Sequence, residues 1–237
     1  MQITGLQKMT LLDFPGKVAC TVFLQGCNFR CPFCHNSDLL DCAGQAEISQ
    51  EQLLDFLKKR RGLLDGVCIT GGEPTLQKDL KSLITQIKAL GFAVKLDTNG
   101  AKPEILRELV EAGLLDYVAM DIKNCPERYG ETAGLPRFPL HNVEQSILFL
   151  MHGELPFEFR TTVVQEFHDD AAIEGIARWF RSLVGDQKVP HYFLQPFVDR
   201  ESVLRTGLHT PNHEALQRFS QILSPICENI CIRGTDS

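Results

Sequence analysis

The chain has 237 residues, of which 43% are hydrophobic and 23% are charged, and its formal net charge is −6. This length suits one domain over residues 1–237, and the acidic balance gives no electrostatic support for nucleic-acid binding. The sequence has no segment apolar enough to span a membrane and no signal-peptide core, and its nine cysteines lack the density of a disulfide scaffold, so we expect a cytoplasmic protein with reduced thiols.

The first notable feature is a cysteine-rich loop. Residues 1–16 end in a turn-forming sequence, and the apolar residues 18–24 then predict a strand. In the loop that follows, over residues 26–36, Cys27, Cys31 and Cys34 have the spacing C-x3-C-x2-C. Thiolates favour zinc, copper(I) or an iron–sulfur cluster. A structural zinc or an ordinary four-iron cluster takes four protein ligands, so three cysteines would leave one iron open to chemistry.

Strands and helices are then predicted to alternate. A helix should begin after Ser49, because Ser49 and Gln52 can form a capping box. Further strands are predicted at 66–70, 92–98, 116–123, 156–164 and 191–197, with a last short strand at about 229–233. Further helices are predicted at 79–90, 103–112, 170–184 and 213–223. After the strand at 116–123, a loop is predicted from 124 to about 140, followed by a helix that ends at about 153.

This order of elements predicts the fold class. Strands that alternate with helices of about 10 to 15 residues indicate βαβ units and a parallel sheet. About six units over residues 17–223 fall short of the eight that close a barrel. We therefore predict an α/β protein with a partial, open (β/α)6 TIM-type barrel, with a doubly wound flat sheet as the alternative. In both folds, ligands bind at the carboxyl ends of the strands.

Polar residues stand where the predicted strands end. Gly71 and Gly72 would let the backbone approach a ligand, and Glu73 could pair with an ammonium group. Asp121 and Lys123 should lie on the same side of their strand, where they could bind both ends of a zwitterion or form a plain surface ion pair. Further strand-end candidates are Asp97, Thr98, Asn99, Gly100, Met120, Arg160, Thr162 and Gln195.

Taken together, these motifs resemble a known family. The cysteine loop and Gly71-Gly72-Glu73 are similar to the two hallmarks of the radical S-adenosylmethionine (radical SAM) enzymes. The longer stretches 23–36, 97–100 and 120–123 resemble glycyl-radical-enzyme activases, closest to the activating proteins of anaerobic ribonucleoside-triphosphate reductase.

The resemblance implies an oxidoreductase of anaerobic metabolism. Cys27, Cys31 and Cys34 would hold one [4Fe–4S] cluster, whose fourth iron would chelate S-adenosylmethionine. Reductive cleavage would give methionine and a 5′-deoxyadenosyl radical, and that radical would take the Cα hydrogen from one glycine of a partner glycyl radical enzyme. Anaerobic ribonucleoside-triphosphate reductase is the favoured partner, with another glycyl radical enzyme as the alternative because activases for such enzymes share the same motifs. A flavodoxin or ferredoxin would donate the electron.

The resemblance also implies roles for single residues. Gly71, Gly72 and Glu73 would take the methionine amino group, while Thr98, Asp121, Lys123 and Arg160 would hold its carboxylate and the ribose. The backbone around Phe33 would flank the adenine, and Asn99 and Gln195 are further cofactor-binding candidates. Asp97, Thr98, Met120 and Asp121 match a monovalent-cation site of pyruvate formate-lyase activase, and Asp13 matches an acidic residue that contacts the partner's glycine-bearing loop.

The sequence also departs from that relative. A histidine that reaches S-adenosylmethionine there is replaced here by Val198, and Gln195 could take over part of its role. Between residues 36 and 70 the chain has two cysteines, Cys42 and Cys68, which predicts no additional cluster. We expect Cys20 and Cys68 to be core residues, whereas the sequence leaves the roles of Cys42, Cys125, Cys227 and Cys231 open.

Two alternative functions remain at this point. A small-molecule radical SAM enzyme such as 7-carboxy-7-deazaguanine synthase shares the size and Gly-Gly-Glu-Pro, but its loop usually reads Cys-Asp-Thr where this chain has Cys34-His35-Asn36. An iron–sulfur electron carrier or a zinc-stabilised binding module is disfavoured by three ligands together with a Gly-Gly-Glu motif.

Overall fold

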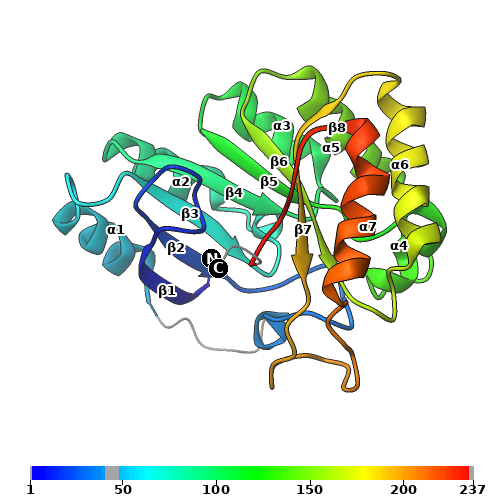
Figure 1. Ribbon diagram of the computed structural model, residues 1–237. Coiled ribbons are helices and arrows are strands. Elements are labelled where there is room, and N and C mark those ends of the chain that lie inside the picture. The colour runs from blue at the N-terminus through cyan, green and yellow to red at the C-terminus, as the bar shows by residue number, and fades with distance from the viewer. Residues whose placement is uncertain (1, 41–47, 235–237) are drawn as a thin grey trace. The chain divides into compact units, whose positions relative to one another are not determined.

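Strands and helices alternate along almost the whole chain in a computed structural model that describes residues 2–40 and 48–234 (Figure 1). The strands follow one another in the order β1 to β8 in an eight-stranded sheet. β1 is antiparallel to β2, whereas the pairs β2–β3, β3–β4, β6–β7 and β7–β8 are parallel. The prediction of an α/β fold with an open, mostly parallel sheet of the partial-barrel type is confirmed.

The chain divides into two compact units. Unit 1 comprises Met1–Asn28 and Asp38–Ala119, and unit 2 comprises Phe29–Ser37 and Met120–Ser237. The boundary falls within β5 and within the cysteine loop, so Cys27 belongs to unit 1 and both Cys31 and Cys34 belong to unit 2. The expectation of a single domain stays a prediction.

Unit 1 contains the first half of the sheet. Its elements are β1 (Ile3–Thr10), β2 (Ala19–Leu24), η1 (Ser37–Leu39) apart from its first residue, α1 (Gln50–Lys59), β3 (Gly66–Gly71), η2 (Pro74–Leu76), α2 (Leu80–Ala89), β4 (Ala93–Thr98), α3 (Pro103–Glu111) and the start of β5 (Tyr117–Asp121). The predicted capping box is present, since the Ser49 hydroxyl accepts from the Gln52 amide at 3.1 Å and the Ser49 amide donates to Gln52 Oε1 at 2.7 Å. Cys20 and Cys68 are fully buried in β2 and β3, as expected of core residues.

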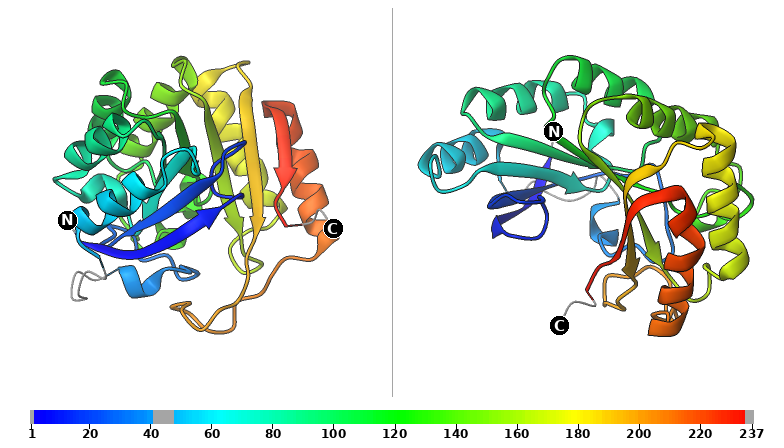
Figure 2. Two further views of the ribbon diagram at one scale, coloured as in Figure 1. Left: turned by 90° about the vertical axis from the view of Figure 1, so that its left-hand side faces the viewer. Right: turned by 45° about the horizontal axis from the view of Figure 1, so that its top comes forward.

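Unit 2 contains the second half. Its elements are α4 (Pro126–Thr132), α5 (His141–His152), β6 (Phe157–Val163), α6 (Asp170–Val184), β7 (Val189–Pro196), α7 (His213–Leu223), η3 (Ser224–Ile226) and β8 (Cys227–Ile232). α6 and α7 pack side by side, and α7 also contacts β7 and β8 (Figure 2). α6 spans the predicted residues because Asp169 caps its first turn, accepting from the Ala172 amide at 2.8 Å, and Gly185 ends it with φ 62°.

One element was not predicted from the sequence, and another contradicts the prediction. Residues 3–10, for which no element was predicted, form β1, in which both end residues are buried but the middle shows no two-residue alternation. Residues 126–132, expected to be loop, form α4, a helix of seven residues that contains Gly130. Such a short helix with an internal glycine carries too little periodicity to be recognised in a sequence.

Within residues 2–40 and 48–234, none of the helices is both long enough and apolar enough to cross a membrane. Cys42 lies outside the described residues.

Candidate active site

The first cysteine follows β2 in a segment that unit 1 holds by its backbone. The amide of Gly72 donates to Leu24 O at 2.9 Å, and the amide of Glu73 donates to Gly26 O at 2.8 Å. On the other side of the segment, the amide of Gly26 donates to Leu39 O at 2.6 Å. The approach to Cys27 is therefore fixed between the Gly-Gly-Glu motif and the end of η1.

The two glycines are needed because this segment passes so close. A Cβ at Gly71, whose φ is +124°, would lie 2.2 Å from Leu24 O, and a Cβ at Gly72 would lie 2.1 Å from Gly26 O. Both distances are far below any real carbon–oxygen contact. The sequence predicted that these glycines let the backbone approach a ligand, and in the structure they also make room for the backbone that leads to Cys27.

Glu73 is buried, with 1% of its surface exposed. Its Oε1 accepts from the Thr75 amide, the Thr75 hydroxyl and the Thr98 hydroxyl at 3.0, 2.6 and 2.8 Å, and its Oε2 accepts from the Asn99 amide at 2.7 Å. Burial raises the pKa of Glu73, and these four hydrogen bonds oppose that rise. Glu73 thus joins η2 to the end of β4. Three of the four hydrogen bonds reach Oε1 and one reaches Oε2, so Oε2 is the oxygen better able to accept from a ligand.

Asn99 connects this cluster to the cysteine loop. Its Nδ2 donates to Asn28 Oδ1 at 2.8 Å, and Asn28 directly follows Cys27 in the sequence. Asn99 also stabilises its own turn, because its Oδ1 accepts from the Ala101 amide at 3.0 Å. The motif 97–100 therefore helps to position the first cysteine.

A buried cation that the sequence analysis missed lies in β4. Lys95 is 2% exposed and its Nζ is ion-paired with Asp97, whose side chain is 12% exposed. The thiol of Cys68 lies 3.8 Å from Lys95 Nζ and 3.7 Å from Asp97 Oδ1. The sequence could have predicted this pair, because Lys95 and Asp97 are two residues apart in a strand and therefore lie on the same face.

In unit 2, the segment from α4 to Phe138 supports the residues before Cys31. The amide of Arg30 donates to Ala133 O at 2.9 Å, and a Cβ at Gly134, whose φ is +70°, would lie 2.1 Å from Arg30 O. The rings of Phe29 and Phe138 meet edge to face at 4.9 Å. The part of the chain predicted as a featureless loop therefore shapes the cysteine loop.

The loop after β7 supports the residues around Cys34. His35 Nε2 lies 2.7 Å from Val198 O, and the ring of His35 stacks on that of Phe197 at 5.4 Å. Ser202 Oγ donates to His35 O at 2.7 Å, and the amide of Arg205 donates to Pro32 O at 2.9 Å. Val198, predicted as a departure from the related activase, thus contributes its backbone to the loop instead of a side chain to a ligand.

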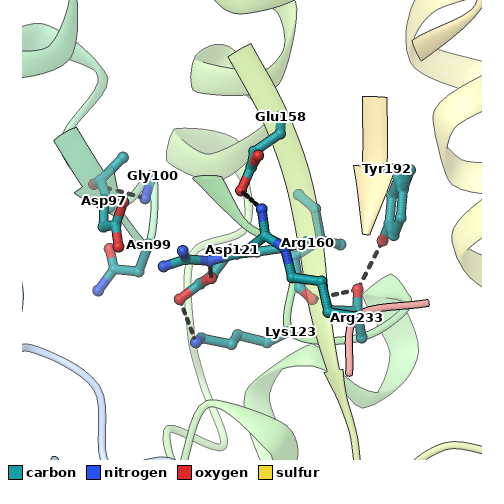
Figure 3. Close-up of polar contacts among 12 residues, drawn as sticks. Asp97, Asn99, Gly100, Asp121, Lys123, Glu158, Arg160, Tyr192 and Arg233 are labelled. Carbon is teal, nitrogen blue, oxygen red and sulfur yellow. Dashed lines mark hydrogen bonds and ion pairs between the residues drawn. The ribbon is translucent and has the colours of Figure 1, made fainter. Parts of the chain in front are cut away.

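A group of three charged residues comprises Asp121 at the end of β5, Lys123 shortly after it and Arg160 in the middle of β6. Asp121 accepts from Lys123 Nζ at 2.9 Å through Oδ2 and from Arg160 Nε at 2.5 Å through Oδ1 (Figure 3). The three side chains are 14–24% exposed, so this is not the plain surface pair considered as an alternative. Burial alone would raise the pKa of Asp121, but the charges of Arg160 and Lys123 outweigh burial and hold that pKa below its ordinary value.

The charge of Lys123 also acts on the cysteine loop. Burial raises the pKa of Cys31 to about 11, and the positive charge of Lys123 is the largest influence that lowers it. Burial likewise raises the pKa of Cys34. Without a metal both thiols are therefore protonated at neutral pH, and metal binding would have to release their protons.

A second charged pair in unit 2 was not expected from the sequence. Glu158 in β6 is fully buried, and its Oε1 accepts from Arg233 Nη2 at 2.6 Å (Figure 3). Arg233 also lies 4.1 Å from the ring centre of Phe193. Glu158 is two residues before Arg160 in the same strand, so the sequence could have predicted that the two side chains lie on one face.

The remaining candidates have the following positions. Phe33 is buried and lies 5.9 Å from the ring of Phe167, and Gln195 is half-buried in register with Thr162. Asp13 is half-buried and accepts from the Thr21 hydroxyl at 2.6 Å. Cys125 is buried at the N-terminus of α4. Cys227 is buried and Cys231 exposed in β8.

The described cysteines are all in the thiol form, without a disulfide among them. Among the described residues, no three His, Cys, Asp or Glu side chains are already arranged around a single metal ion.

Comparison with known proteins agrees with these features. The family model described as "Radical SAM superfamily" matches residues 21–169. A protein of Methanocaldococcus jannaschii named "Putative glycyl-radical enzyme activating enzyme MJ1227" is 31% identical over 98% of this chain and 95% of its own length. The pyruvate formate-lyase 1-activating enzyme of Escherichia coli K12 is 28% identical over 94% of each chain.

A solved structure shows the same fold. The crystal structure of a domain of the pyruvate formate-lyase-activating enzyme from Bacteroides vulgatus superposes with a TM-score of 0.58, covering 71% of this chain and 99% of that domain. At 21% sequence identity this likeness shows the fold alone.

Proposed function

Since this chain belongs to the radical SAM superfamily, among the glycyl-radical-enzyme activating enzymes, we propose that its cysteine loop and strand ends bind the cofactors of that family as follows. Enzymes of this family use a [4Fe–4S] cluster and S-adenosylmethionine. The roles of single residues rest on their sequence motifs and on the contacts within each unit.

The donor atoms of the cysteine loop fit the cluster. Cys27, Cys31 and Cys34 supply three soft thiolates, and an iron–sulfur cluster is held by such ligands. Lys123 favours the thiolate form of Cys31, and burial of Cys31 keeps water from it. The loop residues flanking Cys31 and Cys34 are held at Arg30, Pro32 and His35 by contacts from the rest of unit 2.

The observation that carries the proposal is a pair of cationic side chains held on one carboxylate in unit 2. Lys123 and Arg160 both contact Asp121, at 2.9 and 2.5 Å, and the charge of Lys123 acts on Cys31. Such cations suit a carboxylate ligand, because an Arg guanidinium can bind a carboxylate through two hydrogen bonds. We assign Lys123 and Arg160 to the methionine carboxylate of S-adenosylmethionine, with Asp121 holding both in place.

The other candidates complete this assignment. Glu73 Oε2, together with the backbone of Gly71 and Gly72, would take the amino group, and Thr98, Asn99 and Gln195 are assigned to the remaining polar groups. The backbone around Phe33 would flank the adenine, since Phe33 is held by Phe167. When bound, the cluster supplies the electron that splits S-adenosylmethionine into methionine and a 5′-deoxyadenosyl radical.

The substrate of an activating enzyme is a glycine of a glycyl radical enzyme. We propose anaerobic ribonucleoside-triphosphate reductase as the partner on the likeness of the motifs, with Asp13 contacting its glycine-bearing loop and a flavodoxin or ferredoxin as electron donor. Pyruvate formate-lyase is the competing partner, because activating enzymes for it align with 94% of this chain.

The first experiment tests the chemistry. Reconstituted anaerobically, the protein should bind about four irons per chain and form 5′-deoxyadenosine from S-adenosylmethionine and dithionite. Cys31→Ala should lose almost all iron, whereas Cys231→Ala, which removes an exposed thiol of β8, should keep it. About eight irons per chain would contradict a single cluster, and absence of 5′-deoxyadenosine in an iron-loaded sample would contradict radical chemistry.

The second experiment identifies the partner. The loaded enzyme is mixed with S-adenosylmethionine, a reductant and either ribonucleotide reductase or pyruvate formate-lyase, and a glycyl radical is sought by electron paramagnetic resonance. We expect the radical doublet with the reductase. A doublet with pyruvate formate-lyase alone would reassign the partner, and 5′-deoxyadenosine without a protein radical on either partner would favour a small-molecule substrate.

A further inference from the structure

Lys95 places an ammonium group in the interior of unit 1. The side chain is 2% exposed and its ammonium contacts the carboxylate of Asp97, the first residue of the motif 97–100. A buried ammonium is stable only when a counter-charge accompanies it. Asp97 supplies that counter-charge, and Cys68, fully buried 3.8 Å from the ammonium, adds a weak acceptor.

Asp97 is also one of the four residues that resemble a monovalent-cation site. The contacts within each unit show that the oxygen ligands of this set are already engaged. The Thr98 hydroxyl donates to Glu73 at 2.8 Å and accepts from the Gly100 amide at 3.1 Å. In unit 2, the carboxylate of Asp121 is shared by two cationic side chains.

The charges decide whether a free cation fits. A K⁺ or Na⁺ ion needs uncompensated negative charge or carbonyl oxygens to replace its water shell. Each carboxylate of the set is matched by at least one positive side chain: Asp97 by Lys95, and Asp121 by Lys123 and Arg160. In unit 1, Lys95 already neutralises Asp97, so an ion bound there would add a positive charge without an uncompensated Asp97 carboxylate to balance it. Within unit 1, Asp97 and Thr98 therefore do not fit a monovalent cation.

We propose that the Lys95 ammonium takes the place of the monovalent cation, so that this enzyme holds the motif 97–100 in its working conformation without K⁺ or Na⁺. The ammonium is tethered to β4, and its charge stays with Asp97 whatever the salt. Lys95 is thus a positioning residue, because it acts through Asp97 and the turn that follows. The activity arm of the test below rests on the proposed function, whereas the stability arm does not.

The activity arm uses the reconstituted wild-type enzyme. The rate of 5′-deoxyadenosine formation is measured in KCl, NaCl and tetramethylammonium chloride at one ionic strength. We expect the three rates to agree within about 1.5-fold, a difference of about 0.2 kcal/mol. A rate at least about fivefold lower in tetramethylammonium, or about 1 kcal/mol, would overturn the proposal.

The stability arm uses the cluster-free protein and needs no turnover. The melting temperature of the wild type should be the same in KCl and in tetramethylammonium chloride, whereas Lys95→Met should gain a saturable stabilisation by K⁺ or Na⁺. Lys88→Met is the matched control, because Lys88 pairs with Asp116 at 2.7 Å in a more exposed part of unit 1. It should gain no such dependence.

The outcomes separate this inference from the function. The proposed role of Lys95 would be overturned if K⁺ or Na⁺ stabilised the wild type in a saturable, ion-specific way. It would also be overturned if Lys95→Met folded and its melting temperature did not depend on K⁺ or Na⁺. If Lys95→Met does not fold, the two wild-type measurements still decide. If no 5′-deoxyadenosine forms in any salt, the proposed function fails while the melting curves still test the role of Lys95.

Discussion

Replacing Gly72 by alanine tests whether the Gly-Gly-Glu motif positions the first cysteine. The new Cβ would lie 2.1 Å from Gly26 O, and real Cβ contacts do not fall below 3.0 Å, so the two backbones must separate by about 0.9 Å. The obstacle is a backbone oxygen, which cannot rotate away as a side chain can. The residue before Cys27 therefore has to move.

The expected magnitude follows from two contributions. Forcing a group into a packed site costs about 1–3 kcal/mol, and loss of the hydrogen bond from the Glu73 amide to Gly26 O adds about 0.5–1.5 kcal/mol. Together these amount to about 2–4 kcal/mol, a large share of the roughly 5–15 kcal/mol that stabilises a typical domain. We also expect less iron per chain, because Cys27 is displaced.

Two measurements check this prediction. Urea unfolding of the cluster-free protein gives the change in stability, and iron analysis after anaerobic reconstitution gives the effect on the loop. Gly91→Ala is the control: its φ is +91° but its Cβ would meet nothing within 4 Å. It should cost about 1–2 kcal/mol through backbone strain and leave iron binding unchanged. A Gly72→Ala protein as stable as the wild type and fully loaded with iron would refute the reasoning.

Three further predictions address other supports of the site. Gly134→Ala places a Cβ 2.1 Å from Arg30 O and should lower both the urea midpoint and the iron content; normal iron loading would show that this turn does not shape the loop. Asp121→Asn leaves two partly buried cations without their counter-charge, and we expect urea unfolding to show a loss of stability of about 2–4 kcal/mol. This loss is smaller than for a fully buried ion pair because the Asp121 side chain is 24% exposed. An unchanged unfolding curve would argue against the ion-paired arrangement. Ser49→Ala removes the cap of α1 and should cost about 1 kcal/mol without changing iron content, and an effect on iron would be unexpected for a residue whose role is to cap that helix.

The sequence predicted elements well where a local pattern marks both ends. α6 and α7 begin and end at the predicted residues, because Asp169 and Asn212 cap their first turns and apolar residues recur at helical spacing. The capping box of α1 is likewise a local signal. β1 and α4 carried no such signal, since β1 lacks alternation and α4 is shorter than two full turns plus caps.

For the candidate site, sequence motifs identified positions but not partners. Gly72 was recognised, yet the group it accommodates is Gly26, 46 residues earlier in the chain. Asp97 was recognised, whereas its partner Lys95 was overlooked because a lysine in a strand is ordinarily at the surface. Contacts between distant segments depend on register and strand order, and neither can be read from local spacing.

The contacts from the loop after β7 to the cysteine segment have a consequence for the order of folding. His35 and Ser37 bind Val198 and Ser202, partners 163 to 167 residues later in the chain. During synthesis the three cysteines leave the ribosome early, but these partners follow only after seven of the eight strands have been made. Long-range contacts of this kind form late. We expect the thiols to stay in an unfinished loop until the chain is nearly complete, so that iron uptake acts as a checkpoint on a fully folded protein.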